Sequence, residues 1–184
     1  MGYTLGDLAK VLDKLSSYGV RFVIIGDTVV QLSLRKRELS GDVDLYVIEP
    51  SVIVEEEKYA EIAEKEGWHF TTTEIGTPKI VARVNDKEIH LEFYENIFDI
   101  YIPEEIIEKA GSISVSGIKI RIIKPEEYFV LKARQGVDLD KLEKYVKEYK
   151  KKLDEKTLIK TIKLFPLDEQ KLIISRLKQV GLEI

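Results

Sequence analysis

Two aspartates separated by one residue, Asp42 and Asp44, are the residues of this sequence best arranged to do chemistry. They lie in the run 42–48, where apolar and polar residues alternate as they do along a strand with one buried face. The two carboxylates then share the polar face roughly 7 Å apart, where they repel by about 2 kcal/mol at an effective dielectric constant of 20. A divalent cation with oxygen ligands would neutralise such a pair.

A third carboxylate, Glu92, belongs to a second alternating run at 88–94 and points away from its apolar residues. If the two strands are neighbours, the three carboxylates converge into a cluster that can hold metal ions, clamp a triphosphate and activate a hydroxyl. Asp99 competes for the place of third ligand, and an exposed carboxylate without function is the alternative. His69 and His90 lack metal-ligand spacing, and we interpret them as a structural residue and a bystander.

Upstream, a buried strand at 20–25 runs into Gly26-Asp27-Thr28 and then into a predicted helix at 29–37. Backbone N–H groups at a helix N-terminus attract phosphate, Gly26 permits close approach, and Thr28 adds a hydroxyl. Asp27 is unfavourable there, because an anion ~5 Å from a triphosphate charge costs about 3 kcal/mol at a dielectric constant of 20. Alternatively, its side chain turns away and caps the helix.

These segments resemble a known signature. Residues 25–28, Arg35 and 41–45 resemble the DNA polymerase β-like nucleotidyltransferases, in which an apolar strand, a Gly-rich turn and a helix often carrying Arg precede Asp-x-Asp. The run 123–132 is similar to the strand, Pro-Glu-Asp-Leu and lysine-bearing helix of small prokaryotic members, including the abortive-infection toxin type. The resemblance covers residues 20–142 and extends to the acidic Asp138 and Asp140.

The resemblance implies a Mg²⁺ (or Mn²⁺) enzyme that transfers a nucleoside monophosphate from a nucleoside triphosphate (NTP) to a hydroxyl on RNA, protein or a small molecule. It implies metal ligation by Asp42 and Asp44, with Glu92 as third carboxylate where the family more often has Asp. The nucleotide-binding residues it implies are Gly26, Asp27, Thr28, Arg35 and Lys132.

Two departures leave other functions open. Asp27 stands where the family prefers Gly or Ser, and Glu92 is longer than Asp. A catalytically degenerate binding or regulatory module, such as an antitoxin, is therefore one alternative. An RNA-binding protein that uses the lysine-rich segment 141–163 is the other. A homodimer or a toxin–antitoxin partner is compatible with either.

The composition limits the classes of protein to which the chain can belong. The chain has 184 residues, 44% of them hydrophobic and 34% charged, which is typical of a globular protein. No apolar run approaches the ~20 residues that span a bilayer, and no leader pattern precedes the first helix, so we expect no membrane association and a cytoplasmic location. The absence of Cys excludes disulfides and thiolate metal sites, and abundant Lys, Glu and Ile favour a thermophile. The net charge of −4 gives no overall attraction for nucleic acid.

The pattern of elements predicts a mixed α/β (α+β) fold, with helices packed on a mixed sheet and a C-terminal helical extension. Probable hairpins around 85–87 and 116–117 exclude a purely parallel sheet. We expect residues 1–124 to form a nucleotidyltransferase-like domain and residues 125–184 to form helices packed on it as one structural unit. The remaining expected helices are 4–18, 55–66, 103–110, 125–135, 138–152, 155–165 and 167–180, and the remaining strands are 68–73, 79–84, 113–115 and 118–123.

Overall fold

The computed structural model describes residues 2–97 and 100–184, so Asp99 lies outside the described residues. The chain divides into two compact units. The sheet unit comprises Met1–Tyr101 and Ala110–Ile122, and the helical unit comprises Ile102–Lys109 and Ile123–Ile184.

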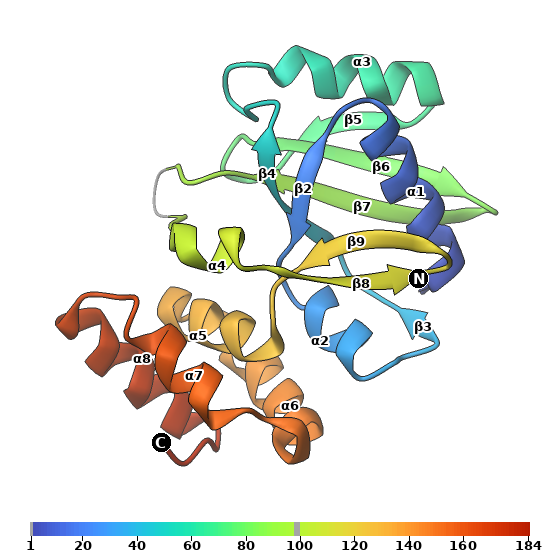
Figure 1. Cartoon of the computed structure of the whole chain (residues 1–184). Coiled ribbons are helices and arrows are strands. Elements are labelled where there is room, and N and C mark those ends of the chain that lie inside the picture. Colours follow the sequence, from blue (N-terminus) through green and yellow to red (C-terminus); the bar gives the residue numbers. More distant parts are fainter. Residues whose placement is uncertain (1, 98–99) are drawn as a thin grey trace. The chain divides into compact units, whose positions relative to one another are not determined.

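A seven-stranded mixed sheet forms the centre of the sheet unit (Figure 1). Its strands β2 and β4 are antiparallel, whereas β4 runs parallel to β7, and β2 runs parallel to β9. The predicted mixed α+β fold is therefore confirmed, together with both hairpins. In spatial order the strands are β5 (His69–Thr72), β6 (Pro78–Val84), β7 (Lys87–Tyr94), β4 (Val43–Glu49), β2 (Arg21–Ile24), β9 (Ile118–Ile122) and β8 (Gly111–Val115).

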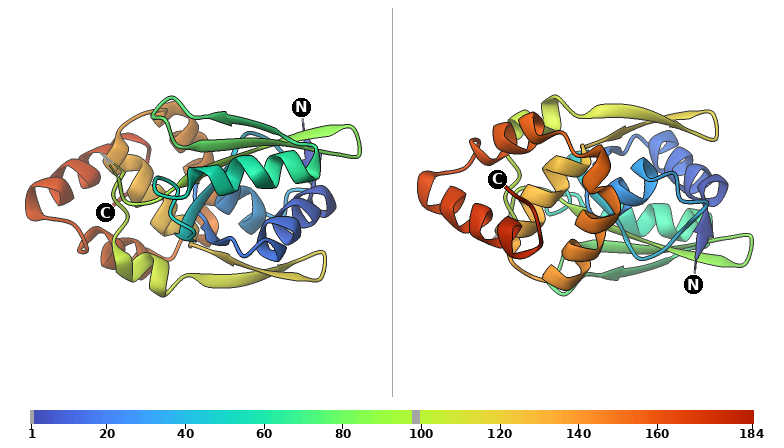
Figure 2. Two further views of the ribbon diagram at one scale, coloured as in Figure 1. Left: turned by 90° about the horizontal axis from the view of Figure 1, so that it is seen from above. Right: turned by 90° about the horizontal axis from the view of Figure 1, so that it is seen from below.

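Two helices, α1 (Leu5–Ser17) and α3 (Glu56–Glu66), lie over the same face of this sheet (Figures 1 and 2). Thr4 begins α1 with a capping box, and Gly67 ends α3 in the left-handed conformation at φ 67°. The ring of Tyr59 on α3 packs on Phe93 of β7 with 4.8 Å between ring centroids. The apolar side chains of β4 and β7 therefore face α3, and their polar side chains face the other way.

A short two-stranded ribbon lies beside this sheet, formed by β1 (Tyr3–Thr4) and β3 (Glu38–Leu39). Both Tyr3 and Leu39 are buried. The helix that we predicted at 29–37 is α2 (Thr28–Ser33), which ends four residues early. The chain leaves the helix at Arg35, which adopts φ 57°, because the next residues pair with β1.

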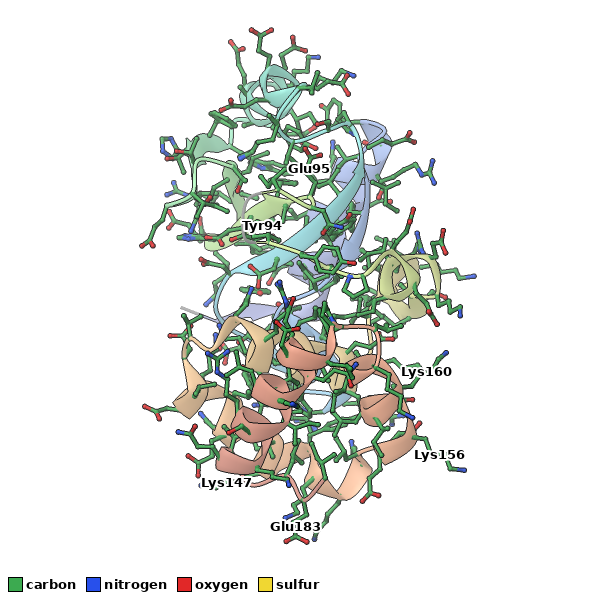
Figure 3. All side chains as sticks on the ribbon, turned by 90° about the vertical axis from the view of Figure 1, so that its left-hand side faces the viewer. Tyr94, Glu95, Lys147, Lys156, Lys160 and Glu183 are labelled. Atoms are coloured by element: carbon green, nitrogen blue, oxygen red, sulfur yellow. The ribbon has the colours of Figure 1, made fainter. Side chains whose placement is uncertain are left out.

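The helical unit contains most of the lysines of the chain. Lys147, Lys156 and Lys160 project outward from it (Figure 3). No helix in the described ranges is both long and apolar enough to cross a membrane. The helices are α4 (Glu104–Glu108), α5 (Pro125–Gln135), α6 (Leu139–Tyr149), the 3-10 turn η1 (Lys150–Lys152), α7 (Glu155–Ile162) and α8 (Leu167–Gln179).

Candidate functional site

The parallel pairing of β4 and β7 brings the predicted carboxylates onto one face of the sheet. Asp44 and Glu92 are direct register partners, and Asp42 stands one residue before β4 begins. Val43 and Leu91, one position earlier in the register, are both fully buried on the opposite face. The expected adjacency of the two strands is confirmed.

Lys79 of β6 links two of these carboxylates. It is the register partner of Glu92, and its Nζ lies 2.7 Å from Glu92 Oε1 and 3.0 Å from Asp42 Oδ2. The Lys79 side chain is 19% exposed and that of Glu92 16%, whereas Asp42 is 41% exposed. The ammonium thus neutralises two carboxylates in a partly desolvated setting, where ion pairs are screened less than on an open surface.

The pKa values reflect this contact. Burial by itself raises the pKa of the Asp42 carboxyl, but its hydrogen bonds with Glu92 and Lys79, with the charge of Lys79, lower that pKa below its ordinary value. Burial likewise lowers the pKa of Lys79, and its hydrogen bonds to Glu92 and Asp42 raise it above its ordinary value. The charged forms of Asp42 and Lys79 therefore stabilise each other.

Two ring side chains of β7 complete the polar face. The hydroxyl of Tyr94 (Figure 3) donates a hydrogen bond to Glu92 Oε2. Burial, followed by this hydrogen bond, raises the pKa of Tyr94 well above its usual range. His90 Nδ1 lies 3.5 Å from Asp42 Oδ1. Tyr94 holds one oxygen of Glu92, while Lys79 holds the other.

Gly26 lies directly against Asp44. The Ile25 N–H donates to the Asp44 carbonyl oxygen at 2.9 Å, which holds the end of β2 to β4. Gly26 adopts φ 53°, and a Cβ at this position would come within 1.9 Å of Asp44 Oδ2. A side chain here would therefore displace the carboxylate, so the turn needs glycine both for its conformation and for space.

The next two residues of the turn point into the protein. Asp27 is 6% exposed and accepts a 3.5 Å hydrogen bond from Gln31, but its side chain makes no capping hydrogen bond to α2. Thr28 is fully buried, and its hydroxyl donates to the Asp42 carbonyl oxygen at 3.5 Å. Burial raises the pKa of Tyr3, a hydrogen bond with Thr28 lowers it, and Asp27 and Asp42 are among the charges that raise it. Tyr3 is therefore close to the turn and to the carboxylates.

The two remaining predicted residues are Arg35 and Lys132. Arg35 is exposed just beyond the C-terminal end of α2, whereas the Gly26 turn precedes its N-terminus. Lys132 belongs to the helical unit, where its ammonium lies 3.0 Å from Asp138 Oδ2. The structure brings together Gly26, Asp42, Asp44 and Glu92.

The chemistry of the donor set fits a hard divalent cation, because all three predicted ligands offer carboxylate oxygens and Gly26 keeps the space beside Asp44 free of a side chain. Among residues 2–97 and 100–184, however, no three or more His, Asp or Glu side chains gather as a metal site requires. The Lys79 ammonium bridges Asp42 and Glu92 instead. Ligation by the three carboxylates remains a prediction.

Our reading of the sequence missed Lys79, Tyr94 and Tyr3 as neighbours of the carboxylates. The signal for Lys79 was available in the hairpin. A two-residue turn at Asn85-Asp86, both at positive φ, sets Lys79 opposite Glu92. A three-residue turn would have set it opposite the buried residue after Glu92. Nothing comparable predicts Tyr3, because its contact depends on the β1–β3 ribbon.

The mixed sheet thus brings Asp44 of β4, Glu92 of the parallel strand β7 and the Gly26 turn together, with Asp42 directly before β4. The chain belongs to the family described as "Nucleotidyl transferase of unknown function (DUF2204)", whose model matches residues 4–179. The resemblance to the nucleotidyltransferase superfamily is confirmed.

Solved structures show the same fold. An antigenic nucleotidyltransferase-like protein from Paracoccidioides brasiliensis aligns over 98% of this chain and 91% of its own, with a TM-score of 0.62 and 16% identity. The antibiotic-resistance factor ANT(2″)-Ia aligns over 95% of this chain and 91% of its own, with a TM-score of 0.51 and 13% identity. No curated protein matches the chain.

Proposed function

We propose that the protein transfers a nucleoside monophosphate from a metal-bound NTP to a hydroxyl group. The observation that carries this proposal is the convergence of Asp42, Asp44 and Glu92 on one face of the sheet, directly beside the Gly26 turn. Membership in a nucleotidyl transferase family supports the reaction class.

In this reaction the acceptor oxygen attacks the α-phosphorus, the bond from that phosphorus to the bridging oxygen breaks, and pyrophosphate leaves. A bound Mg²⁺ or Mn²⁺ would supply charge neutralisation for the triphosphate and lower the pKa of the acceptor hydroxyl. We assign Asp42 and Asp44 to holding the metal. We assign Glu92 to completing the site and taking the proton of the acceptor, a role that requires one of its oxygens to exchange its present hydrogen bond with Lys79 or Tyr94 for one with the acceptor.

The turn from Gly26 to Thr28 would bind the triphosphate through backbone N–H groups. The charged side chain of this turn, Asp27, is buried. Arg35 and Lys132 are assigned to nucleotide binding only by the family resemblance.

The test is calorimetric titration with the Mg²⁺ complex of each common NTP, with pyrophosphate release as a second readout. Asp42→Asn combined with Asp44→Asn should weaken binding at least a hundredfold. The matched control, Asp13→Asn with Asp86→Asn, removes the same charge from exposed positions of the sheet unit and should bind as the wild type does. Equal binding by the site variant and the wild type would sink the assignment.

A second candidate is a module that binds nucleotide without catalysis. It is favoured by Lys79, which already neutralises Asp42 and Glu92. Asp27→Gly discriminates between the two functions. A gain in NTP affinity or turnover supports a site weakened by this residue, whereas binding without pyrophosphate release in both forms supports the module.

RNA is the acceptor that we would test first. Lysines of the helical unit such as Lys147, Lys156 and Lys160 are exposed and suited to phosphate contacts (Figure 3). RNA retention that weakens steeply with salt, and that falls when these three lysines are replaced by glutamine, supports this acceptor. Retention that is absent or independent of salt removes it.

A further inference from the structure

Lys79 occupies an unusual position for a lysine in this protein. Its stem lies in the polar face of β6, and its ammonium contacts Asp42, just before β4, at 3.0 Å and Glu92 of β7 at 2.7 Å. By contrast, Arg83, four register pairs further along the same hairpin, forms an ion pair with Glu88, and its side chain is 71% exposed. Lys79 joins two carboxylates in a half-buried cluster, whereas Arg83 belongs to an ordinary surface pair.

The ammonium and a divalent metal cannot share these two oxygens. Mg²⁺ binds carboxylate oxygens at about 2.0–2.1 Å. A metal held by Asp42 Oδ2 and Glu92 Oε1 would therefore stand within a few ångströms of the place that Lys79 Nζ now holds, with like charges in contact. Either the ammonium or the metal can bridge the pair, but not both.

We propose that Lys79 is an exchangeable counter-ion, whose ammonium holds Asp42 and Glu92 together before metal binds and leaves both carboxylates when a divalent cation takes them. This inference rests on the proposed function, because it concerns the same carboxylates. The inference gives Lys79 a role that the family resemblance did not imply. The metal ion then competes with the Lys79 ammonium for Asp42 and Glu92.

The side chain is able to leave. It is 19% exposed, its stem is a flexible chain of four carbons, and within residues 2–97 and 100–184 its ammonium hydrogen-bonds to the two carboxylates alone. The triphosphate of a bound nucleotide offers the released ammonium new oxygen partners. Metal and nucleotide therefore bind better together than metal does alone, and the coupling is mutual.

The test measures Mn²⁺ binding without nucleotide by electron paramagnetic resonance of the free ion. Lys79→Met keeps the length of the side chain and removes its charge, so Mn²⁺ affinity should rise at least tenfold. Lys79→Arg restores a cation and should return the affinity to within about threefold of the wild type. The matched control, Arg83→Met, removes a cation from the same hairpin and should leave the affinity unchanged.

Thermal unfolding gives a second readout, which does not depend on activity. In a chelator, Lys79→Met should unfold several degrees below the wild type, because Asp42 and Glu92 then repel each other. Mn²⁺ should raise the melting temperature of Lys79→Met more than that of the wild type. An equal or smaller increase in the variant contradicts the exchange.

Unchanged or weaker Mn²⁺ binding by Lys79→Met, or no binding by any form, overturns the inference. The proposed function is judged separately, by the binding of Mg²⁺–NTP and its loss in the Asp42→Asn, Asp44→Asn variant. If NTP binding depends on these aspartates but Lys79→Met binds Mn²⁺ no more tightly than the wild type, only the proposal that Lys79 is an exchangeable counter-ion is rejected. A gain in Mn²⁺ affinity without NTP binding by any form rejects only the transfer reaction.

Discussion

The sheet unit and the helical unit both carry many charges, but they arrange them differently. On the sheet, Lys79 of β6 and Glu92 of β7 are paired in register, Asp42 directly precedes β4, and all three side chains are partly buried. On the helices, pairs such as Glu143 and Lys147 lie one turn apart along the same helix, with Lys147 71% exposed. The charged side chains of the sheet cluster interact because the backbone holds them next to one another. The charged side chains of the helices are exposed, so water can replace their ion-pair partners.

This difference separates a site from a solvated surface. Burial and a shared counter-ion shift the pKa values of Asp42 and Lys79, and neighbouring charges there are costly to leave unpaired. Exposed pairs at i, i+4 contribute a few tenths of a kcal/mol and can be lost without consequence. The number of charged residues in a segment is therefore a poor guide to function, and their placement on adjacent strands is a better one.

The largest expected effect is at the turn of the sheet unit. Gly26→Ala should lower the free energy of unfolding by about 3 kcal/mol and abolish NTP binding, because the new Cβ strains a positive φ and displaces the Asp44 carboxylate. Urea unfolding and calorimetry measure the two effects. Gly41→Ala is the control, since Gly41 adopts φ 84° with no atom within 4 Å of a Cβ, and it should cost only about 1–2 kcal/mol. Equal losses would mean that the contact with Asp44 has no consequence.

The second largest effect is expected at Glu126, a charged residue of the helical unit that is buried instead of exposed. Glu126 is 3% exposed and accepts the Asp154 N–H at 2.8 Å, so it resembles the charges of the sheet more than those of its own unit. Glu126→Ala should destabilise the protein by about 2 kcal/mol in urea unfolding, because a buried donor loses its partner. Glu155→Ala, at an exposed position of the same unit, is the control. A loss no greater than that of the control would remove the exception.

A smaller effect concerns the pH dependence of the sheet cluster. The folded pKa of Asp42 is below its ordinary 3.8, so its contribution to stability is present above that pH and is lost as the pH falls through the folded value. The wild type should therefore lose more stability on acidification below about pH 4 than Asp42→Asn does. The difference should stay under about 1 kcal/mol, because water screens a carboxylate that is 41% exposed. Melting curves of both proteins at several acidic pH values measure it, and parallel curves would contradict the ion-pair account.

The smallest effect is expected on the helices. Lys147→Ala removes the partner of Glu143 and should change the free energy of unfolding by less than about 0.5 kcal/mol. Urea unfolding at low and high salt measures it. A loss above 1 kcal/mol would show that the helical unit depends on its ion pairs, and the contrast between the two units would then disappear.

Much of the site followed from local patterns. The alternation along β4 and β7 predicted which side chains are buried, and the face that carries Asp42, Asp44 and Glu92 is the one expected. The caps at Thr4 and Gly67 were equally local. Such features depend on neighbours in sequence, so a single chain is enough to predict them.

Contacts between distant segments were harder to predict. The end of α2 depends on pairing with residues near the N-terminus, and the predicted helix was too long for that reason. Lys79 required the register of a hairpin, and Tyr3 required a ribbon that no periodicity indicates. Asp27 was expected either to face the nucleotide or to cap α2, but it is buried without capping the helix.

The β1–β3 ribbon has a practical consequence for handling this protein. Tyr3 pairs with Leu39, and its hydroxyl donates to the carbonyl oxygen of Gly41 at 3.3 Å, next to the first aspartate of the site. Tyr3 and Thr4 thus hold the segment that immediately precedes Asp42. Removing the residues before Leu5 would take away the pairing partner of Glu38 and Leu39 and the hydrogen bond to Gly41.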